Sequence, residues 1–360
     1  MIEKNKTTKK IKIVELFGGI GAVRKALIKQ NIPHEVIDYV EPNEWAVKAY
    51  NSLYFENFKP KDIKNYKLPN KKIDLLVHTS LCQDFSKTEH KKIDEQIERL
   101  IGTYYVSHLW EIFRIVQEAK YKPEIILWEN SKKILNKKYK PVLDMYIKEL
   151  KKLGYQSVYK VLNSSDFGIP QDRERTFCIS FLDKPSSFNL NFKKQKMKNI
   201  NEFVKEGCQD EKYLLNFKKS PSIVNGYFNK KVKLITDKTK AIPTKWISLH
   251  HIGVFKEEIP FYKKQEIENH FKFVNATEKD KSIYKLYDND IFFINNEPCY
   301  LRVLKESECL ALMGFDDWDF KKINALSIPK KELYKLAGNS IVVDVLEAIF
   351  KRLNKRIWTE

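Results

Sequence analysis

Short apolar runs alternate with stretches of helical apolar spacing over the first half of the chain. Runs of β-branched and other apolar residues between turn residues predict buried strands. These predicted strands are Ile11–Leu16, Glu35–Val40, Ile73–Val77, Glu124–Trp128, Ser157–Val161 and Thr176–Phe181. Apolar residues at helical spacing predict helices at Ala22–Gln30, Trp45–Tyr50, Leu109–Ala119 and Pro141–Leu153. Strands that alternate with helices predict an α/β fold, with a mostly parallel, Rossmann-like sheet covered on both faces.

The pattern changes after Lys184. From there to about residue 300 the chain is rich in Lys, Asn, Phe and Tyr, contains several prolines and shows little sustained helical periodicity. Regularity returns at Ser307–Met313, and a closing helix is predicted at Ser340–Leu353. The sequence therefore predicts three parts: a first domain at 1–184, a smaller, irregular domain at 185–325, and a C-terminal segment at 326–360 that returns to the first domain.

The charge balance is strongly basic. The chain has 66 Lys plus Arg against 47 Asp plus Glu, a formal net charge of +19. Such a field favours binding to a polyanion, and nucleic acid is the leading candidate. A Lys-rich, AT-biased genome would produce the same composition, so composition alone leaves both explanations open.

The cysteines and the N-terminal region indicate a cytoplasmic protein. No Cys-x-x-Cys pair occurs, so no metal site is expected, and five scattered cysteines suit a reducing compartment. Lys12 and Glu15 interrupt the apolar stretch that follows the basic N-terminal residues. This stretch is therefore predicted to be a first strand rather than part of a secretion signal. No uncharged apolar run reaches membrane-spanning length, so no membrane association is expected.

A glycine-rich segment, Phe17-Gly18-Gly19-Ile20-Gly21, lies between the first predicted strand and the first predicted helix. Glycines there allow a tight turn and let a ligand approach backbone amides at a helix start. Alone, the segment fits a simple turn equally well. Glu41 ends the second predicted strand roughly 20 residues on, where an acidic residue usually holds a ribose diol, and this favours a nucleotide-like ligand.

Two polar residues follow apolar strands, and two arginines lie close together further on. Cys82 enters a polar loop after the third strand, and Glu129 ends the fourth, so both are expected at the sheet edge where ligands bind. Taken alone, Cys82 would more often be a buried structural thiol, and Glu129 a capping or surface carboxylate. Arg173 and Arg175 share a face of an extended segment, which suits binding of a base, a carboxylate or a phosphate, or a solvated surface pair.

Five short segments together resemble the DNA cytosine methyltransferases that methylate carbon 5 of the base. In chain order they are Glu15–Ala22, Asp74–Ser86, Leu127–Asn130, Gln171–Arg175 and Ala337–Val343. Each segment alone is a weak signal, but the five agree in order and spacing. The resemblance spans almost the whole chain except roughly residues 185 to 300.

The resemblance implies a covalent mechanism on a cytosine that has left the duplex stack. A thiolate of Cys82 would add to carbon 6, which turns the ring into a nucleophile able to attack a sulfonium methyl group. Glu129 would be the acid near ring nitrogen 3. The resemblance implies that Arg175 fixes the cytosine, and Arg173 is the less favoured candidate for a catalytic role. Further substrate-binding residues implied are Gln83, Asn130 and Gln171.

The resemblance also implies S-adenosyl-L-methionine as the cofactor. Glu41 matches the ribose-binding carboxylate, although Glu44 competes in a shifted register. Asp62 matches the residue that contacts the adenine amino group, or is a turn aspartate. Asn339 matches a pocket residue, or is a helix cap. The implied cofactor-binding residues are Phe17, Gly18, Gly19, Ile20, Gly21, Glu41, Pro42, Asp62, Ile63 and Asn339.

The chain departs from the family pattern at three places, two of them beside the predicted nucleophile Cys82. Leu81 stands where the family has proline, and Ser131 stands where it has valine after the Glu-Asn pair. The stretch Lys87–Leu100 lacks the glycine of the family's mobile loop. Proline pre-sets backbone geometry, so its loss would loosen the aim of the thiol. Because all charged and nucleophilic groups remain, we expect reduced or ordinary activity rather than none.

The expected partner is double-stranded DNA, read by the irregular domain at 185–325. Within it, Ala241–Lys245 resembles the family's threonine-bearing stretch before its recognition loops. A monomer is expected, either accompanied by a cognate restriction endonuclease or standing alone as a host or phage enzyme. Two alternatives remain open: the related enzymes that methylate cytosine in tRNA, and a catalytically impaired DNA-binding relative. The long basic segment argues against the first, and intact Cys82, Glu129 and Arg175 argue against the second.

Overall fold

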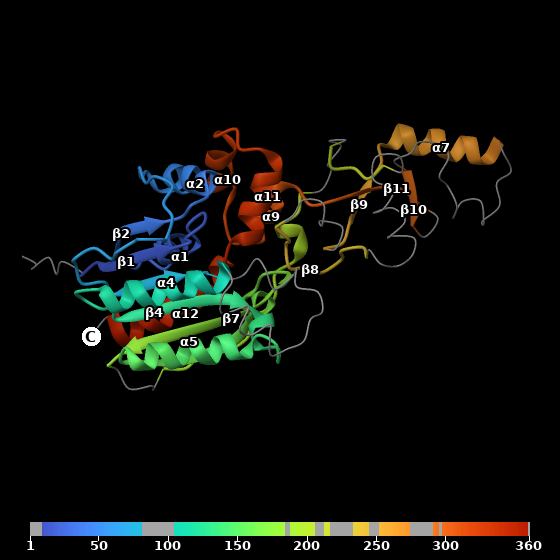
Figure 1. The fold of residues 1–360 in the computed structure, drawn as a ribbon. Helices are drawn as coiled ribbons and strands as arrows, with labels where there is room; N and C mark the ends of the chain where they lie inside the picture. Colours follow the sequence, from blue (N-terminus) through green and yellow to red (C-terminus); the bar gives the residue numbers. More distant parts are fainter. Residues whose placement is uncertain are drawn as a thin grey trace, which may run out of the picture.

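The computed structural model describes residues 9–80, 104–183, 188–205, 212–216, 233–244, 252–273, 291–294 and 297–358. Its centre is a six-stranded sheet in the order β2-β1-β3-β4-β7-β5 (Figure 1). The strands are β1 Ile11–Leu16, β2 His34–Val40, β3 Leu75–His78, β4 Ile125–Ser131, β5 Tyr155–Asn163 and β7 Glu174–Leu182.

The direction of the strands decides which residues meet. Strands β1, β2, β3 and β4 are parallel, so their carboxyl ends share one edge of the sheet. Strand β7 is antiparallel to both β4 and β5. The beginning of β7 therefore lies beside the end of β4, and the register pairs Arg175 with Ser131 and Phe177 with Glu129.

Alternating side chains of the strands build a core on each face of the sheet. Val14, Leu76 and Ile126 pack with helices α4 and α5 on one face. Ile13 and Leu75 pack with helices α1, α2 and α12 on the other. These helices are α1 Ala22–Lys29, α2 Glu44–Tyr54, α4 Tyr104–Glu118, α5 Lys140–Lys152 and α12 Val343–Leu353. The predicted α/β fold, with a mostly parallel sheet covered on both faces, is confirmed.

Two helices near the C-terminus were not predicted from the sequence. Helix α10 (Asp317–Asn324) begins at Asp316, whose side chain accepts hydrogen bonds from the backbone of Trp318 and Asp319. Helix α11 (Lys330–Asn339) follows, with Ser340 as its C-cap. The predicted closing helix therefore starts at Val343 rather than at Ser340, because the residues before it end α11.

Helices α9 (Glu306–Ala311) and α10 contact the first domain, although the predicted boundary at 325 assigns them to the second. Helix α10 packs against α2, and α9 against α11. The ammonium group of Lys25 in α1 lies 2.8 Å from Asp316 and 2.7 Å from Asp319. Part of the stretch before residue 325 thus belongs structurally with the sheet domain.

A smaller unit projects away from the large sheet in Figure 1. It contains the antiparallel sheet β10-β11-β9 and helix α7, in a stretch where the sequence predicted little helix. Arg302, fully buried at the end of β11, pairs with Glu257 of β9 and Glu308 of α9, which joins the unit to the first domain. The elements are β9 Phe255–Glu258, α7 Phe261–Phe273, β10 Ile291–Ile294 and β11 Glu297–Arg302.

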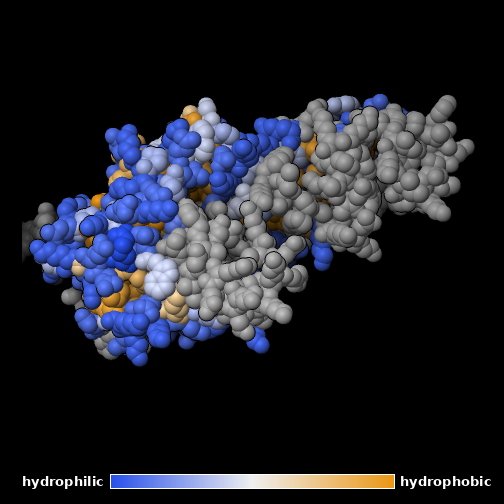
Figure 2. Space-filling view, viewed as in Figure 1, coloured by the Kyte–Doolittle hydropathy of each residue, from blue (hydrophilic) through white to orange (hydrophobic). Residues whose placement is uncertain are grey.

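A second connection runs through the parallel pair β6 (Gln171–Asp172) and β8 (Thr239–Lys240). The remaining short helical turns are η1 Lys132–Leu135, η2 Ser164–Phe167, η3 Ile200–Glu202 and η5 Asn354–Trp358. The described surface in Figure 2 is mostly hydrophilic. In the part of the chain that the structure describes, no helix has the length and apolar character needed to cross a membrane.

Candidate active site

The glycine-rich segment forms a tight loop between β1 and α1. Phe17, Gly19 and Gly21 have φ angles of 57°, 56° and 79°, in the left-handed region that favours glycine. A Cβ atom on Gly21 would lie 2.4 Å from a ring carbon of Tyr54, whereas one on Gly19 would meet nothing within 4 Å. The loop is therefore packed on the Gly21 side and open on the Gly19 side, where a ligand can approach.

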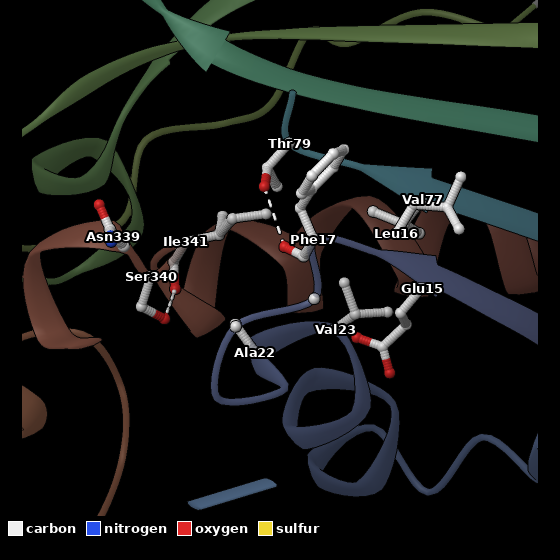
Figure 3. Close-up of a pocket in the computed structure, with 12 residues that line it drawn as sticks. Glu15, Leu16, Phe17, Ala22, Val23, Val77, Thr79, Asn339, Ser340 and Ile341 are labelled. Atoms are coloured by element: carbon white, nitrogen blue, oxygen red, sulfur yellow. Dashed lines mark hydrogen bonds between the residues drawn. The ribbon is translucent and has the colours of Figure 1, made fainter. Parts of the chain in front are cut away.

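A pocket lies beside this loop (Figure 3). Its lining comes from the loop, the end of β3 and the junction of α11 with α12, and includes Phe17, Gly19, Thr79, Asn339 and Ile341. The Thr79 hydroxyl donates to the Phe17 carbonyl at 3.0 Å, which ties the end of β3 to the loop. Asn339, predicted to be a pocket residue or a helix cap, is the last residue of α11. Its side chain is exposed and lines the pocket.

Glu41 contacts the glycine-rich loop. Its carboxylate accepts a hydrogen bond from the Gly19 backbone at 3.2 Å and another from the Asn43 backbone at 2.9 Å. Burial raises its pKa, and these two hydrogen bonds oppose that rise. Glu44, the alternative, is an exposed residue in the first turn of α2. The geometry therefore favours Glu41 for a ribose.

The other predicted cofactor residues differ in accessibility. Pro42 and Asp62 are exposed, and the Asp62 carboxylate accepts from the Lys64 backbone at 2.9 Å, as in a turn. The ring of Phe17 lies 5.3 Å from that of His108, whose pKa is lowered by burial, and the negative charge of Asp62 opposes that lowering. Ile20 and Ile63 are each 1 % exposed and pack in the core, so only their backbones remain available for a ligand.

Glu129 and Arg175 meet at the end of β4. The Arg175 Nε atom lies 3.2 Å from a carboxylate oxygen of Glu129, whose side chain is 5 % exposed. Burial raises the pKa of Glu129, and the positive charges of Arg175 and, to a smaller degree, Arg173 lower it. The carboxyl can thus hold a proton to a higher pH than an exposed glutamate, which suits a proton donor.

Cys82 and Gln83 lie outside the described residues, but the chain just before them is firmly held. The Ser80 carbonyl accepts from the Trp128 indole at 3.2 Å and from the Asn130 amide at 3.1 Å. His78 bridges the Ser80 hydroxyl, at 3.0 Å, and the Tyr146 hydroxyl, at 2.8 Å. Burial lowers the pKa of His78 to about 3, so its ring is neutral near pH 7. These contacts fix the backbone at Ser80, next to Leu81, which stands where the family has proline.

Replacing Asn130 with alanine is expected to slow the methyl transfer that the resemblance implies by about 2- to 12-fold, the value of one hydrogen bond, because the Trp128 indole would still hold Ser80. Single-turnover rates on DNA measure this effect. The matched control is Asn191→Ala, whose exposed amide oxygen accepts from Lys160 and has no contact with Ser80. Equal rates for the Asn130 variant and the wild type would contradict a positioning role for this amide.

Arg173 and Gln171 hydrogen-bond to the backbone of distant segments, and their roles toward the substrate stay predictions. The Arg173 guanidinium, 3 % exposed, donates to the carbonyls of Ile242, Gly338 and Ser340 at 3.1, 2.8 and 2.8 Å. The fully buried Gln171 amide donates to the Leu312 carbonyl at 2.9 Å and accepts from the Ile242 backbone at 3.3 Å. Strand β7 begins only at Glu174, so Arg173 and Arg175 reach different partners despite their spacing.

Four residues of the site lie within the segments that carry the resemblance, but the sequence analysis assigned none of them a role. Thr79 and Ile341 line the pocket, and His78 holds Ser80. Glu15 lies beneath the loop with 0 % exposure, and burial raises its pKa to about 7. In Figure 3 its carboxylate points toward α1, whereas the Phe17 side chain lies near Thr79. These roles depend on tertiary contacts, so the motifs alone did not assign them.

Comparison with known proteins identifies the family. The family model for C-5 cytosine-specific DNA methylases matches residues 11–355. The type II methyltransferase M2.ScrFI of Lactococcus lactis subsp. cremoris is 25% identical over 96% of this chain and 99% of its own length. The orphan methyltransferase M.SPRI of Bacillus phage SPR is 26% identical, over 96% and 97%. The crystal structure of S. pombe Dnmt2 methyltransferase shares the fold, with a TM-score of 0.68, 19% identity, and coverage of 96% of this chain and 99% of that one. The chain thus belongs to the C-5 cytosine-specific DNA methylase family and is a DNA cytosine methyltransferase.

Proposed function

We propose that this enzyme methylates carbon 5 of a cytosine flipped out of a specific double-stranded DNA sequence, through a covalent bond between Cys82 and carbon 6 of the ring. The observation that carries this proposal is the pairing of buried Glu129 with half-buried Arg175 at the sheet edge. The glycine loop after β1 and the anchored Ser80 after β3 are at the same edge. A nucleophile, an acid and a cofactor pocket would therefore converge on one base.

In the proposed reaction, Cys82 acts first as the nucleophile and Glu129 as the acid. The Cys82 thiolate adds to carbon 6, and the negative charge that builds on the ring is offset by a proton from Glu129 at nitrogen 3. Arg175 orients the Glu129 carboxyl and can contact the base. Carbon 5, now nucleophilic, accepts the methyl group. Water takes the proton from carbon 5, the Cys82 thiolate leaves carbon 6, and the proton on nitrogen 3 returns to Glu129. These steps restore the neutral aromatic ring and free the enzyme.

The pocket residues fit S-adenosyl-L-methionine. Glu41 offers a carboxylate to a ribose diol at the end of β2, and the loop opens on the Gly19 side at the start of α1. Phe17 and the exposed Asp62 can contact an adenine, and Asn339 approaches from α11. When bound, the cofactor supplies the electrophilic methyl group. The chain's own contribution is to orient it toward carbon 5.

Transfer of a labelled methyl group tests this proposal against the alternatives. The purified enzyme would be given tritiated S-adenosyl-L-methionine with either double-stranded DNA or tRNA, and the labelled nucleosides would be identified. The proposal expects 5-methylcytosine in DNA. Label in tRNA alone would favour the tRNA-directed branch, and no label in either substrate would favour a catalytically impaired relative.

We also propose that the smaller unit, within residues 206–301, reads the target sequence, and that its Lys-rich segments contact phosphates. Exchanging residues 206–301 for the counterpart of a related enzyme of known target should transfer that target to the chimera. These junctions keep α9 and α10, and keep Arg302 beside Glu308. Sequencing of the methylated sites measures the outcome. A chimera that kept the original target would place recognition elsewhere in the chain.

The names of the relatives support two biological settings. One relative is a type II methyltransferase and another an orphan methyltransferase, so the enzyme either shares its target with a restriction endonuclease or acts without one. We propose that it acts as a monomer in both settings, because one chain supplies the whole catalytic edge and the smaller unit.

A further inference from the structure

Three buried tyrosines form a layer beneath the glycine loop. Tyr39 comes from β2, and Tyr50 and Tyr54 come from α2. The rings of Tyr39 and Tyr50 are stacked with centroids 4.0 Å apart, and those of Tyr50 and Tyr54 meet edge to face at 4.8 Å. Their exposures are 0 %, 0 % and 9 %. Because these three hydroxyl groups are buried, each needs a hydrogen-bond partner within the protein.

Two of the three hydroxyls hydrogen-bond to the loop itself. Tyr39 donates to the Gly19 carbonyl at 2.6 Å, and Tyr54 donates to the Gly21 carbonyl at 2.7 Å. Tyr50 instead donates to the Glu15 carboxylate at 2.8 Å, on the strand that precedes the loop. The three residues share one environment and differ in what their hydroxyls hold.

Peptide geometry turns these contacts into an orientation of the amide groups. In a trans peptide the carbonyl and the following N–H point in opposite directions. Holding the Gly19 carbonyl toward Tyr39 therefore directs the N–H group of Ile20 away from it. The Gly21 carbonyl accepts from the Lys25 backbone at 2.9 Å as well as from Tyr54, and both bonds direct the Ala22 N–H the other way. Ala22 begins α1 and lines the pocket, so its N–H lies where a helix start can bind a negative group.

The rings also limit the position of the loop. A Cβ on Gly18 would lie 2.8 Å from a Tyr39 ring carbon, and one on Gly21 would lie 2.4 Å from a Tyr54 ring carbon. The loop thus rests directly on the ring edges, and the hydroxyls hold it from the same side.

We propose that Tyr39 and Tyr54 are positioning residues for cofactor binding, whose hydroxyls hold the glycine-loop carbonyls and so aim its amides into the pocket. This inference rests on the proposed binding of S-adenosyl-L-methionine at the loop. If the tyrosines served packing alone, phenylalanine would replace them without effect on cofactor affinity, since the rings would remain.

The experiment compares Tyr39→Phe, Tyr54→Phe and the double variant with Tyr50→Phe as the matched control. Calorimetric titration with S-adenosylhomocysteine gives the Kd of each full-length protein, and steady-state kinetics gives KM for the cofactor and kcat. Each of the two single changes should raise Kd and KM by about 2- to 12-fold, the value of one hydrogen bond, with kcat at saturating cofactor unchanged. Tyr50→Phe should leave Kd within about twofold of the wild type, since its hydroxyl does not reach the loop.

The outcomes separate this inference from the proposed cofactor site. A wild-type protein that does not bind S-adenosylhomocysteine would overturn the site itself and the inference with it. A wild-type protein that binds, with unchanged Kd in folded Tyr39→Phe and Tyr54→Phe variants, would overturn the inference alone. Thermal unfolding identifies the folded variants, and the two single variants test the two hydroxyls independently.

Discussion

Replacing Cys82 with serine is expected to abolish methyl transfer while leaving DNA and cofactor binding largely intact. A free thiol has a pKa of about 8.5, and a serine hydroxyl is far harder to ionise, so serine cannot supply the nucleophile that carbon 6 requires. Transfer of tritiated methyl groups to DNA measures the activity, and fluorescence anisotropy of a labelled duplex measures binding. Full activity in the serine variant would end the thiolate mechanism.

Cys178 provides the matched control for this change. It lies buried in β7, and burial raises its pKa to about 12, so it has no nucleophilic role near pH 7. Cys178→Ala should therefore retain activity as long as it folds. DNA containing 5-fluorocytosine gives a second readout, because fluorine at carbon 5 blocks release of the enzyme. The wild type and Cys178→Ala should form a covalent complex that survives denaturation, and Cys82→Ser should form none.

Replacing Glu129 with glutamine is expected to slow the chemical step by about 100- to 10,000-fold, as is typical for loss of a general acid or base. Glutamine keeps the shape but cannot supply a proton to the ring. Cofactor affinity should hardly change, because the glycine loop and Glu41 remain intact. Single-turnover rates measure the step, and calorimetry with S-adenosylhomocysteine measures the affinity.

Glu174, which precedes Arg175 in β7, supplies the control for Glu129. Its side chain is 43% exposed and pairs with Lys132, so Glu174→Gln should keep its activity. The wild-type rate should also fall as the pH rises through the burial-raised pKa of Glu129, since the carboxyl then loses the proton it donates. A Glu129→Gln variant that lost cofactor binding but kept its turnover rate would mean that the residue is misassigned.

The strand pattern of the first domain could be predicted because each strand is a short apolar run between turn residues. The direction of β7 could not, since an apolar run reads the same in a parallel or an antiparallel strand. That direction brings Arg175 to Glu129. Helix α10 was missed because it is short and depends on its Asp316 cap more than on a sustained apolar stripe.

Some residues of the site could likewise be predicted from the sequence, and others could not. Phe17, Gly19 and Glu41 belong to local motifs, and the structure brings them together. The spacing of Arg173 and Arg175 suggested that they share a face and favoured Arg175 for the base, but it did not show that Arg173 contacts distant backbone groups. The contacts of Gln171 and Arg173 are to backbone carbonyl and amide groups of distant segments, which leave no mark in the sequence.

Bisulfite sequencing of DNA from cells that express this protein tests the central claim most directly, because the treatment leaves 5-methylcytosine unconverted while ordinary cytosine is converted. The account predicts unconverted cytosines at one position of one short recurring sequence. It also predicts that this protection disappears when Cys82→Ser is expressed at the same level. Full conversion with the wild-type protein, or protection that persists with Cys82→Ser, would contradict it.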